Sequence, residues 1–255
     1  MRNTLTFAGV NLGNAFQLYT NGNQTYKGAT RTYDPQQVPG RHGDILLHEN
    51  RLANDELVYR CFIPPDNFED DIAELRDFLL SSANVGYQRI EDTYHPDEYR
   101  LGYFEGPFEP EVMPSLQAGA FDLTFKVKPQ RFLKSGEEWI TYTQDSWIYN
   151  PTYNDSLPIV RAYGTGTFQI THFDVNGNAI KNNVITVLDD LVYVDIDSEI
   201  EDCYEETTNR NGDVTLTDYK FPTLIGKTNG NKTKVSFPSG TNITSIRILP
   251  RWYRL

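Results

Sequence analysis

The sequence has few of the residue types that serve sulfur chemistry or nucleic-acid binding. Only 2 of its 255 residues are cysteine, and only 2 are methionine. Cys61 and Cys203 are far apart and indicate no disulfide framework, and we expect Cys61, in an apolar run, to be a buried, inert thiol. The 23 Lys and Arg stand against 35 Asp and Glu, which gives a net charge of -12. Binding through phosphate contacts depends on clustered Lys and Arg, so this composition excludes a protein held on nucleic acid.

Long apolar runs are also missing. No stretch approaches the roughly 20 apolar residues that span a bilayer, so we expect no membrane insertion. Residues 1–7 are polar within a few positions and lack the apolar core of a signal peptide. We therefore expect the protein to fold in the cytoplasm.

Patterns of catalytic and metal-binding residues are absent as well. The four histidines are His42, His48, His95 and His172. None stands at zinc-ligand spacing from another His or Cys, and there is no nucleophile elbow or phosphate-binding glycine loop. The sequence predicts no catalytic residue, no metal site, no cofactor and no enzyme.

Aromatic residues are abundant, with 16 Tyr, 14 Phe and 3 Trp. Such side chains bury large apolar areas, and disordered chains are poor in them, so the chain is long and apolar enough for one or two folded domains. The acidic excess is spread along the chain: residues 1–135 carry 13 basic and 19 acidic side chains, and residues 136–255 carry 10 and 16.

The sequence pattern predicts a mainly β protein. In residues 119–129, Phe121, Leu123, Phe125 and Val127 alternate with polar residues, which is typical of a half-buried antiparallel strand. Further strands are expected at 44–48 and 57–63. One α-helix is predicted over residues 67–81, because apolar residues recur at three- and four-residue spacing behind an acidic first turn that Asp66 or Asn67 could cap.

From residue 137 onward, short strands alternate with turns, which favours a sandwich or barrel. Asn176-Gly177 is a strong hairpin signal. Further strands are expected at 184–188, 191–196, 213–217, 232–237 and 243–248. We expect the boundary between two domains in the region 134–150.

A dense acidic run is the sharpest candidate for a metal site. It comprises Asp195, Asp197, Glu199, Glu201, Asp202, Glu205 and Glu206. Its spacing resembles the start of a calcium loop, but Ile200 stands where such a loop needs glycine. The simpler interpretation is a solvated loop between strands.

Two other functional classes stay open. A β-sandwich rich in Tyr and Trp could stack sugars on Trp139, Trp147 or Trp252, although such rings more often pack in cores or interfaces. A glycoside hydrolase needs two carboxylates at a set separation, and among 35 acidic residues some pair meets that separation by chance.

Several segments, taken in order, resemble one family. They are the turn Val38-Pro39-Gly40-Arg41-His42-Gly43, the helix segment 75–79, a tyrosine-rich hairpin at 98–104, a closing strand at 125–132, the entry segment 150–160 and the Pro250-Arg251-Trp252 ending. This order is similar to that of the distal tail proteins of phages with long non-contractile tails. The resemblance rests on the order and spacing of these segments, which cover essentially the whole chain.

The resemblance implies two domains. Residues 1–135 would form an N-terminal ring-forming, β-sandwich-like domain with one α-helix and a hairpin that embraces the neighbouring subunit. Residues 136–248 would form a C-terminal galectin-like or carbohydrate-module-like β-sandwich, and residues 249–255 would return to the first domain.

The resemblance also implies a structural role in the virion, at the tail tip. Family members form a homohexameric ring that joins the tail tube protein to the tail-associated hub protein and, in some phages, to receptor-binding proteins. We expect Arg41, Tyr99, Arg100 and Tyr103 at the subunit interface; the alternative is a local salt bridge for Arg41 and core packing for the tyrosines. DNA would only pass through the channel, past a negative wall. The alternative function is a carbohydrate-binding module of a host-recognition protein.

Overall fold

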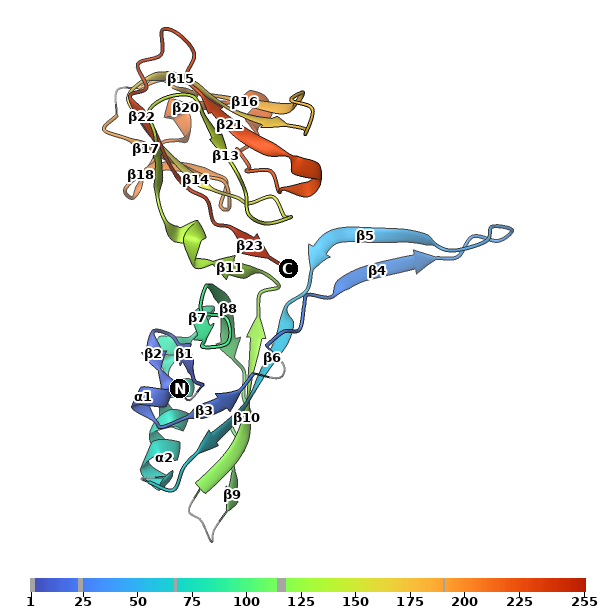
Figure 1. Cartoon of the computed structure of the whole chain (residues 1–255), viewed down its shortest axis with the longest axis vertical. Coiled ribbons are helices and arrows are strands. Elements are labelled where there is room, and N and C mark those ends of the chain that lie inside the picture. The colour runs from blue at the N-terminus through green and yellow to red at the C-terminus, as the bar shows by residue number, and fades with distance from the viewer. Residues whose placement is uncertain (1–2, 23–24, 67, 114–117, 190) are drawn as a thin grey trace. The chain divides into compact units, whose positions relative to one another are not determined.

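The chain folds into two compact units (Figure 1). The computed structural model describes residues 3–22, 25–66, 68–113, 118–189 and 191–255. The first unit comprises Met1–Arg131 and Leu255, and the second comprises Phe132–Arg254. Each unit has its own cluster of buried apolar side chains. The boundary expected after residue 135 is four residues beyond this division.

The first unit is built on an antiparallel sheet with the strand order β2-β1-β7-β8-β10-β6-β3, and β9 pairs with the beginning of β10. Its strands are β1 (Leu5–Phe7), β2 (Val10–Asn11), β3 (Tyr19–Asn21), β6 (Asp55–Ile63), β7 (Gln88–Asp92), β8 (Glu98–Phe104), β9 (Glu111–Met113) and β10 (Ala118–Val127). Its helices are α1 (Leu12–Ala15), α2 (Phe68–Leu79) and the 3-10 turn Ser82–Asn84.

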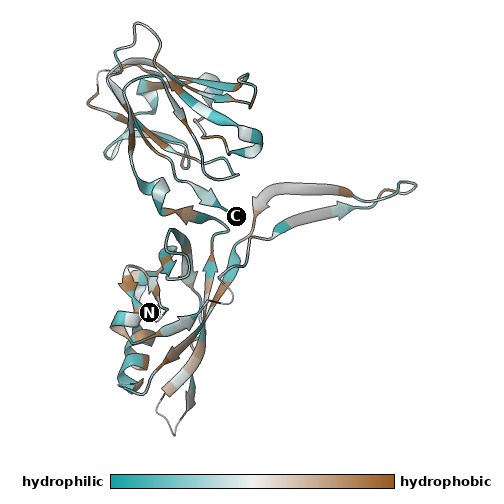
Figure 2. Cartoon of the chain, in the orientation of Figure 1, coloured by the Kyte–Doolittle hydropathy of each residue, from teal (hydrophilic) through white to brown (hydrophobic). Residues whose placement is uncertain are grey.

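Strand β10 lies between β8 and β6 in this sheet, and its predicted alternation is confirmed. Phe121, Leu123, Phe125 and Val127 are all buried. β6 pairs with β10 along its whole length and adds its own alternating apolar residues to the same core. Figure 2 shows the hydrophobic residues of this unit gathered in these strands and in the helices.

The predicted helix is present as α2, and it is slightly shorter than expected. Phe68, Leu75 and Leu79 are buried, and the first turn carries three acidic residues that complement the helix dipole. Asn67, one of the two expected caps, lies outside the described residues. The four-residue α1 was not predicted, because a helix this short shows no apolar periodicity.

The strands β4 (Arg31–Gln36) and β5 (Ile45–Leu52) form a hairpin outside the main sheet. Within the described residues these two strands pair only with each other, and they extend away from the sheet (Figure 1). Residues 35–45, which include the loop between the strands, are exposed. We call β4, β5 and their connecting loop the arm.

The second unit is a β-sandwich, as predicted. One sheet has the order β12-β22-β14-β17-β18-β19 and the other has the order β13-β21-β15-β16-β20. The first sheet contains β12 (Ile140–Tyr142), β14 (Ile159–Tyr163), β17 (Val194–Asp197), β18 (Asp202–Glu205), β19 (Thr208–Asn209) and β22 (Ser245–Leu249). The second contains β13 (Ser146–Ile148), β15 (Gly166–Phe173), β16 (Ala179–Val187), β20 (Val214–Leu216) and β21 (Lys232–Ser236). Side chains of both sheets share one core, among them Val160 and Ile248 from one sheet and Phe168 and Ile185 from the other.

Turns and short connections complete the second unit. They include β11 (Arg131–Leu133), whose first residue belongs to the first unit, β23 (Tyr253–Arg254), which pairs with β11, and the 3-10 turns Lys134–Glu137, Asn211–Asp213, Thr217–Tyr219 and Thr228–Gly230. The predicted hairpin at Asn176-Gly177 is confirmed: Gly177 has a φ of 85° and its N–H donates to the carbonyl of Asp174 at 3.1 Å. The strand expected from residue 191 begins only at Val194.

We expected residues 249–255 to return to the first unit; residues 249–254 group with the second unit, and Leu255 groups with the first. Trp252 is buried in the core of the sandwich, and its carbonyl accepts a hydrogen bond from the N–H of Leu133 at 2.8 Å. The Arg251 guanidinium bonds to both carboxylate oxygens of Asp197 in β17. Burial of the indole and this ion pair hold the chain end against the sandwich.

We predict that Gly102→Ala destabilises the first unit by about 1–3 kcal/mol, because overpacking a tight core strains its neighbours. A Cβ at Gly102 would lie 2.6 Å from Val127 Cγ1 and 2.8 Å from Ile90 Cδ1. Urea unfolding measures the loss. Gly28→Ala is the control, since a Cβ there meets nothing within 4 Å. Equal stabilities of the two variants would contradict this account of the packing.

Candidate functional site

Among the described residues, no group of three or more His, Cys, Asp or Glu side chains is placed to hold a metal ion. In the same part of the chain no helix is long and apolar enough to cross a membrane. Cys61 and Cys203 are buried and unpaired, and burial raises the pKa of each thiol to about 12. At neutral pH both cysteines are therefore thiols, which are poor nucleophiles.

The acidic run of the second unit differs from the expected solvated loop. Asp195 and Asp197 lie in β17 and are each only 3% exposed. Arg161 binds both oxygens of Asp195 at 2.7 Å, and Arg251 binds those of Asp197 at 2.6 and 2.9 Å. The solvated interpretation was wrong for these two residues, because a buried carboxylate needs a paired cation. Glu199, Glu201 and Glu206 are exposed, as expected.

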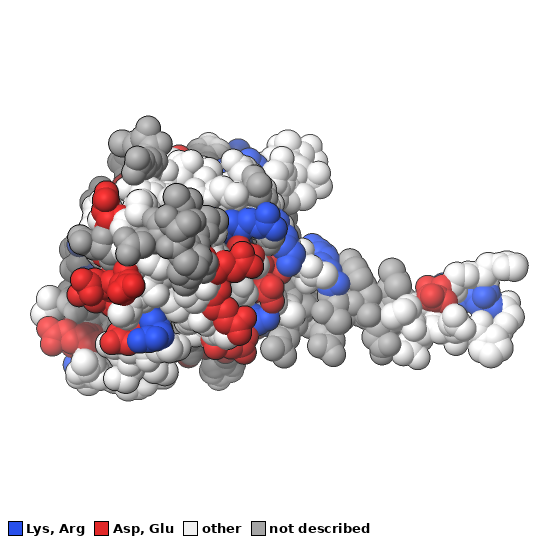
Figure 3. Space-filling model, turned by 90° about the horizontal axis from the view of Figure 1, so that it is seen from below, with Lys and Arg blue, Asp and Glu red and all other residues white. Residues whose placement is uncertain are grey.

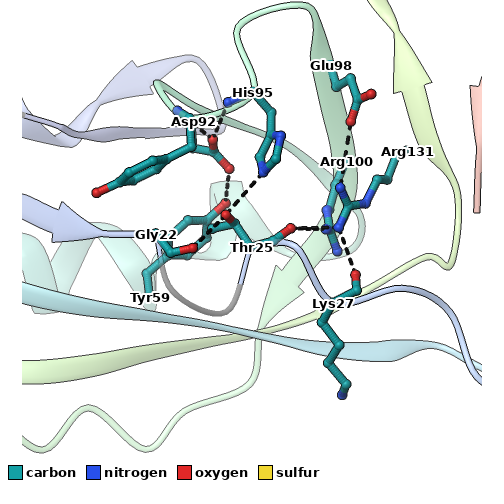
Figure 4. A network of polar contacts seen from close by, with 10 residues as sticks. Gly22, Thr25, Lys27, Tyr59, Asp92, His95, Glu98, Arg100 and Arg131 are labelled. Carbon is teal, nitrogen blue, oxygen red and sulfur yellow. Dashed lines mark hydrogen bonds and ion pairs between the residues drawn. The ribbon is translucent and has the colours of Figure 1, made fainter.

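The most elaborate polar network of the first unit lies where the chain enters the arm (Figure 4). Its centre is Thr25, which is completely buried. The Thr25 carbonyl accepts hydrogen bonds from Arg100 at 2.8 Å and from Arg131 at 2.6 Å. Arg131 also donates to the carbonyl of Lys27 at 2.7 Å. Two guanidinium groups from β8 and β11 thus hold the backbone just before β4.

The second half of this network fixes the side chain of Thr25. Its hydroxyl donates to the carbonyl of Gly22 at 2.8 Å and lies 3.1 Å from Nε2 of His95. The Asp92 carboxylate accepts the backbone N–H of His95 at 2.9 Å and the hydroxyl of Tyr59 at 2.8 Å. Burial, and then the Asp92 charge, raise the pKa of Tyr59 well above its usual value. The phenol therefore stays protonated and keeps donating to Asp92.

A further ion pair closes the base of the arm. Lys27 Nζ, before β4, lies 2.6 Å from Asp55 Oδ1, at the start of β6 after the arm. Asp55 is nearly buried, and its Oδ1 also accepts the N–H of Glu56 at 2.8 Å. Because this ion pair joins the residues before and after the arm, the base of the arm is held in place. We call the contacts of Thr25, Lys27, Asp55, Arg100 and Arg131 the arm root.

The predicted interface residues lie in two places. Arg41 is exposed in the loop of the arm. Tyr99 and Tyr103 share the outer face of β8, where the guanidinium of Arg89 lies 3.8 Å from the Tyr99 ring centroid and Tyr87 contacts Tyr103 edge-on. Arg100 alternates to the opposite face, is buried and bonds within the arm root.

The tyrosine-rich segment 98–104 is a single strand, so the expectation of a hairpin within it was wrong. The hairpin is formed by β7 and β8, and its turn covers residues 93–97. The Asp92 side chain accepts the N–H groups of both Tyr94 and His95, which bends the chain before β8 begins.

Thr25, Lys27, Asp55 and Arg131 were missed by the sequence analysis. Threonine and lysine in a polar stretch carry no signal of burial, and the partners of Thr25 are 75 and 106 residues away in the chain.

Solved structures with a similar fold include phage hub and baseplate proteins. One is the Dit (gp 19.1) protein of phage SPP1, described as a paradigm of the hub adsorption apparatus in phages that infect Gram-positive bacteria. It matches with a TM-score of 0.70 and 14% identity over 97% of this chain and 98% of that chain. Chains of the phage p2 baseplate in its activated conformation, with strontium or calcium, match with a TM-score of 0.52 and 10% identity over 97% of this chain and 96% or 97% of theirs.

No family model matches the chain, and no curated protein matches its sequence. The likeness to solved structures therefore shows the fold: this chain has the distal-tail-protein fold over almost its full length. The fold expected from the family resemblance is confirmed.

We predict that Arg131→Met loosens the base of the arm, because it removes the charged donor to two carbonyls and leaves Glu98, 3.9 Å away, without this cation. Each hydrogen bond to a charged group contributes about 1.5–3 kcal/mol. Hydrogen exchange should therefore speed up in residues 25–31. Arg60→Met is the control, since Arg60 is exposed and lies 3.9 Å from Asp122. Unchanged exchange in the Arg131 variant would argue against the arm root as an anchor.

Proposed function

We propose that this chain is a structural subunit at the tail tip of a phage, where it forms a homohexameric ring. The ring would join the tail tube protein to the tail-associated hub protein of the adhesion apparatus and, in some assemblies, to receptor-binding proteins. One observation carries the proposal: the match to the SPP1 Dit protein spans both units at a TM-score of 0.70. The protein would assemble in the host cytoplasm and reside in the virion.

The arm gives this role a physical basis. An isolated two-stranded hairpin has little stability in water, so an exposed hairpin on an anchored base is suited to contact another molecule. We propose the neighbouring subunit as that molecule, with Arg41 in the contact. Tyr99 and Tyr103 would add a second contact from the outer face of β8, since tyrosine is enriched at the cores of interfaces. Arg100 would support the interface from within, through the arm root.

The role requires no catalysis, and we propose none. A ring subunit needs complementary surfaces, and the side chains of the polar networks described above bond to one another or to the backbone. The buried carboxylates Asp195 and Asp197 are each bound by an arginine. Such pairs hold a sandwich together, and neither of these two carboxylates is left unpaired.

The acidity of the chain suits a passage for DNA. Acidic side chains gather on the face of the first unit seen from below in Figure 3, and α2 contributes Glu69, Asp70, Asp71, Glu74 and Asp77. The carboxylates of α2 repel one another: burial and then the charges of Glu74 and Asp70 raise the pKa of Asp71. Six copies, at -12 each, carry -72. We propose a negative channel wall along which DNA slides without being held.

We predict that removing the arm disrupts the ring and spares the fold. Replacing residues 33–50 by a Gly-Ser-Gly turn keeps Lys27 and Asp55, so the arm root stays closed. Light scattering of the protein, alone and with the tail tube and hub proteins of the same phage, should show hexamers for the parent and monomers for the variant. Tyr153→Ser, which changes an exposed residue of the second unit, should still assemble. A parent chain that stays monomeric with both partners would count against the proposed function.

The two outward tyrosines have a separate test. We expect Tyr99→Ser with Tyr103→Ser to weaken assembly about tenfold or more, a loss of at least about 1.4 kcal/mol. The second unit should unfold as in the parent, because these residues lie outside its core. A ring of unchanged stability would reject β8 as an interface strand.

The structure of the assembled ring tests the proposal that the channel wall is negative. We expect its lumen to be lined mainly by Asp and Glu, and we expect the ring not to retain double-stranded DNA at low salt, where electrostatic attraction is strongest. A lumen lined mainly by Lys and Arg would overturn it.

A further inference from the structure

The outer face of the five-stranded sheet carries exposed aromatic rings on its edge strand β13 and on the residue that follows it. Exposure alternates from residue 146 onward: Trp147 is 39% and Tyr149 is 68% exposed, whereas Ile148 and Asn150 are buried. Trp147, in β13, and Tyr149, one residue after β13 ends, are therefore both exposed on the outer side of the sheet. Phe173, from β15, meets the Trp147 ring edge-on with the centroids 5.1 Å apart.

Polar side chains continue this surface across the sheet. Strand pairing places Trp147 opposite Lys234, Lys234 opposite Thr171, and Thr171 opposite Asn182. Residues in such a row point to the same face. The Thr171 hydroxyl donates to the Asn182 carbonyl oxygen at 2.7 Å, which leaves the two amide N–H donors of Asn182 for other acceptors.

The cations of this face belong to β21. Lys234 Nζ lies 2.8 Å from Asp145, which also accepts the N–H of Phe237 at 2.9 Å. Lys232 Nζ lies 4.2 Å from the centroid of the Trp147 ring. No ion pair of Lys232 with a carboxylate occurs among the described residues. In a chain with a net charge of -12, this face offers an ammonium group beside exposed rings.

We propose that this face binds a saccharide that carries an anionic substituent, either phosphate or carboxylate. The apolar C–H face of a sugar ring would rest on Tyr149 and on the exposed part of Trp147, as apolar groups pack on aromatic surfaces. The anion would pair with Lys232, and Lys234, Asp145 and Asn182 would bond to hydroxyl groups. This proposal is independent of ring formation.

The chemistry of the face selects this ligand class over others. A protein partner would need a larger apolar patch than the rings of this face provide. Thr171, Asn182 and Lys234 instead fill the centre of the face with hydrogen-bonding groups. A neutral sugar would stack on the rings but would leave the Lys232 ammonium without a counter-charge. An inorganic anion would pair with the ammonium but would not contact the rings.

The test is a glycan array that contains neutral, phosphate-substituted and uronic-acid-containing oligosaccharides, probed with the full-length protein. We expect binding to one of the two anionic groups, and the group that binds identifies the source of the charge. Trp147→Ala and Tyr149→Ala should each weaken that binding about tenfold or more, and Lys232→Gln should abolish the preference for anionic over neutral glycans.

Two controls keep the outcome clear. Tyr219→Ala removes an aromatic residue that is 93% exposed elsewhere in the second unit, and it should bind as the parent does. Thermal unfolding verifies that each variant is folded, and light scattering verifies that assembly is unchanged, so failure here is distinguishable from failure of the ring proposal. Binding to no glycan, binding to neutral glycans alone, or full binding by folded Trp147→Ala overturns the proposal.

Discussion

Two guanidinium groups on the carbonyls of Thr25 and Lys27 are the constraint on which the first unit's proposed role depends. The arm has no sheet neighbour among the described residues, so its direction is set only where it leaves and rejoins the sheet. Neutral hydrogen bonds at that place would open readily in water. Charge-assisted bonds to a buried residue are stronger, and the Lys27–Asp55 pair ties the outgoing chain to the returning one. A hairpin held in this way can present Arg41 at a defined place.

The second unit uses arginine for a related purpose. Arg161 and Arg251 neutralise Asp195 and Asp197, which lie two residues apart on β17 and point to the same face. Removing one partner of such a pair leaves an uncompensated buried charge, which costs about 3–5 kcal/mol. Arg251 also has a φ of 53°, a strained value for a side-chain-bearing residue. The ion pair and the burial of Trp252 offset that strain and attach the chain end to the sandwich.

Local signals predicted much of the fold, and distant partners explain the rest. The alternation of β10, the apolar periodicity of α2 and the Asn176-Gly177 turn are each encoded within a few residues, and each is present. The burial of Asp195 and Asp197 depends on arginines 34 and 54 residues away, so an acidic run looked like a solvated loop. Of the candidate site, Arg41 and the tyrosines could be selected from turn and aromatic patterns, whereas Thr25 and Arg131 could not, because nothing near them in sequence marks a buried carbonyl.

Separate cores explain how one chain could serve both assembly and recognition. The apolar residues that stabilise the first unit come from β1, β6, β10 and α2, and those of the second come from its two sheets. Residues on the outer face of the sandwich, such as Trp147 and Lys232, contribute little to either core, so substitutions there change binding at small cost in stability. The arm root, by contrast, includes the buried Arg100 and the nearly buried Arg131 and Asp55, and removing a partner from such charges destabilises the fold. The expected pattern is therefore a constant anchor for the arm and a variable outer face on the sandwich, since physical constraint is strong at the first and weak at the second.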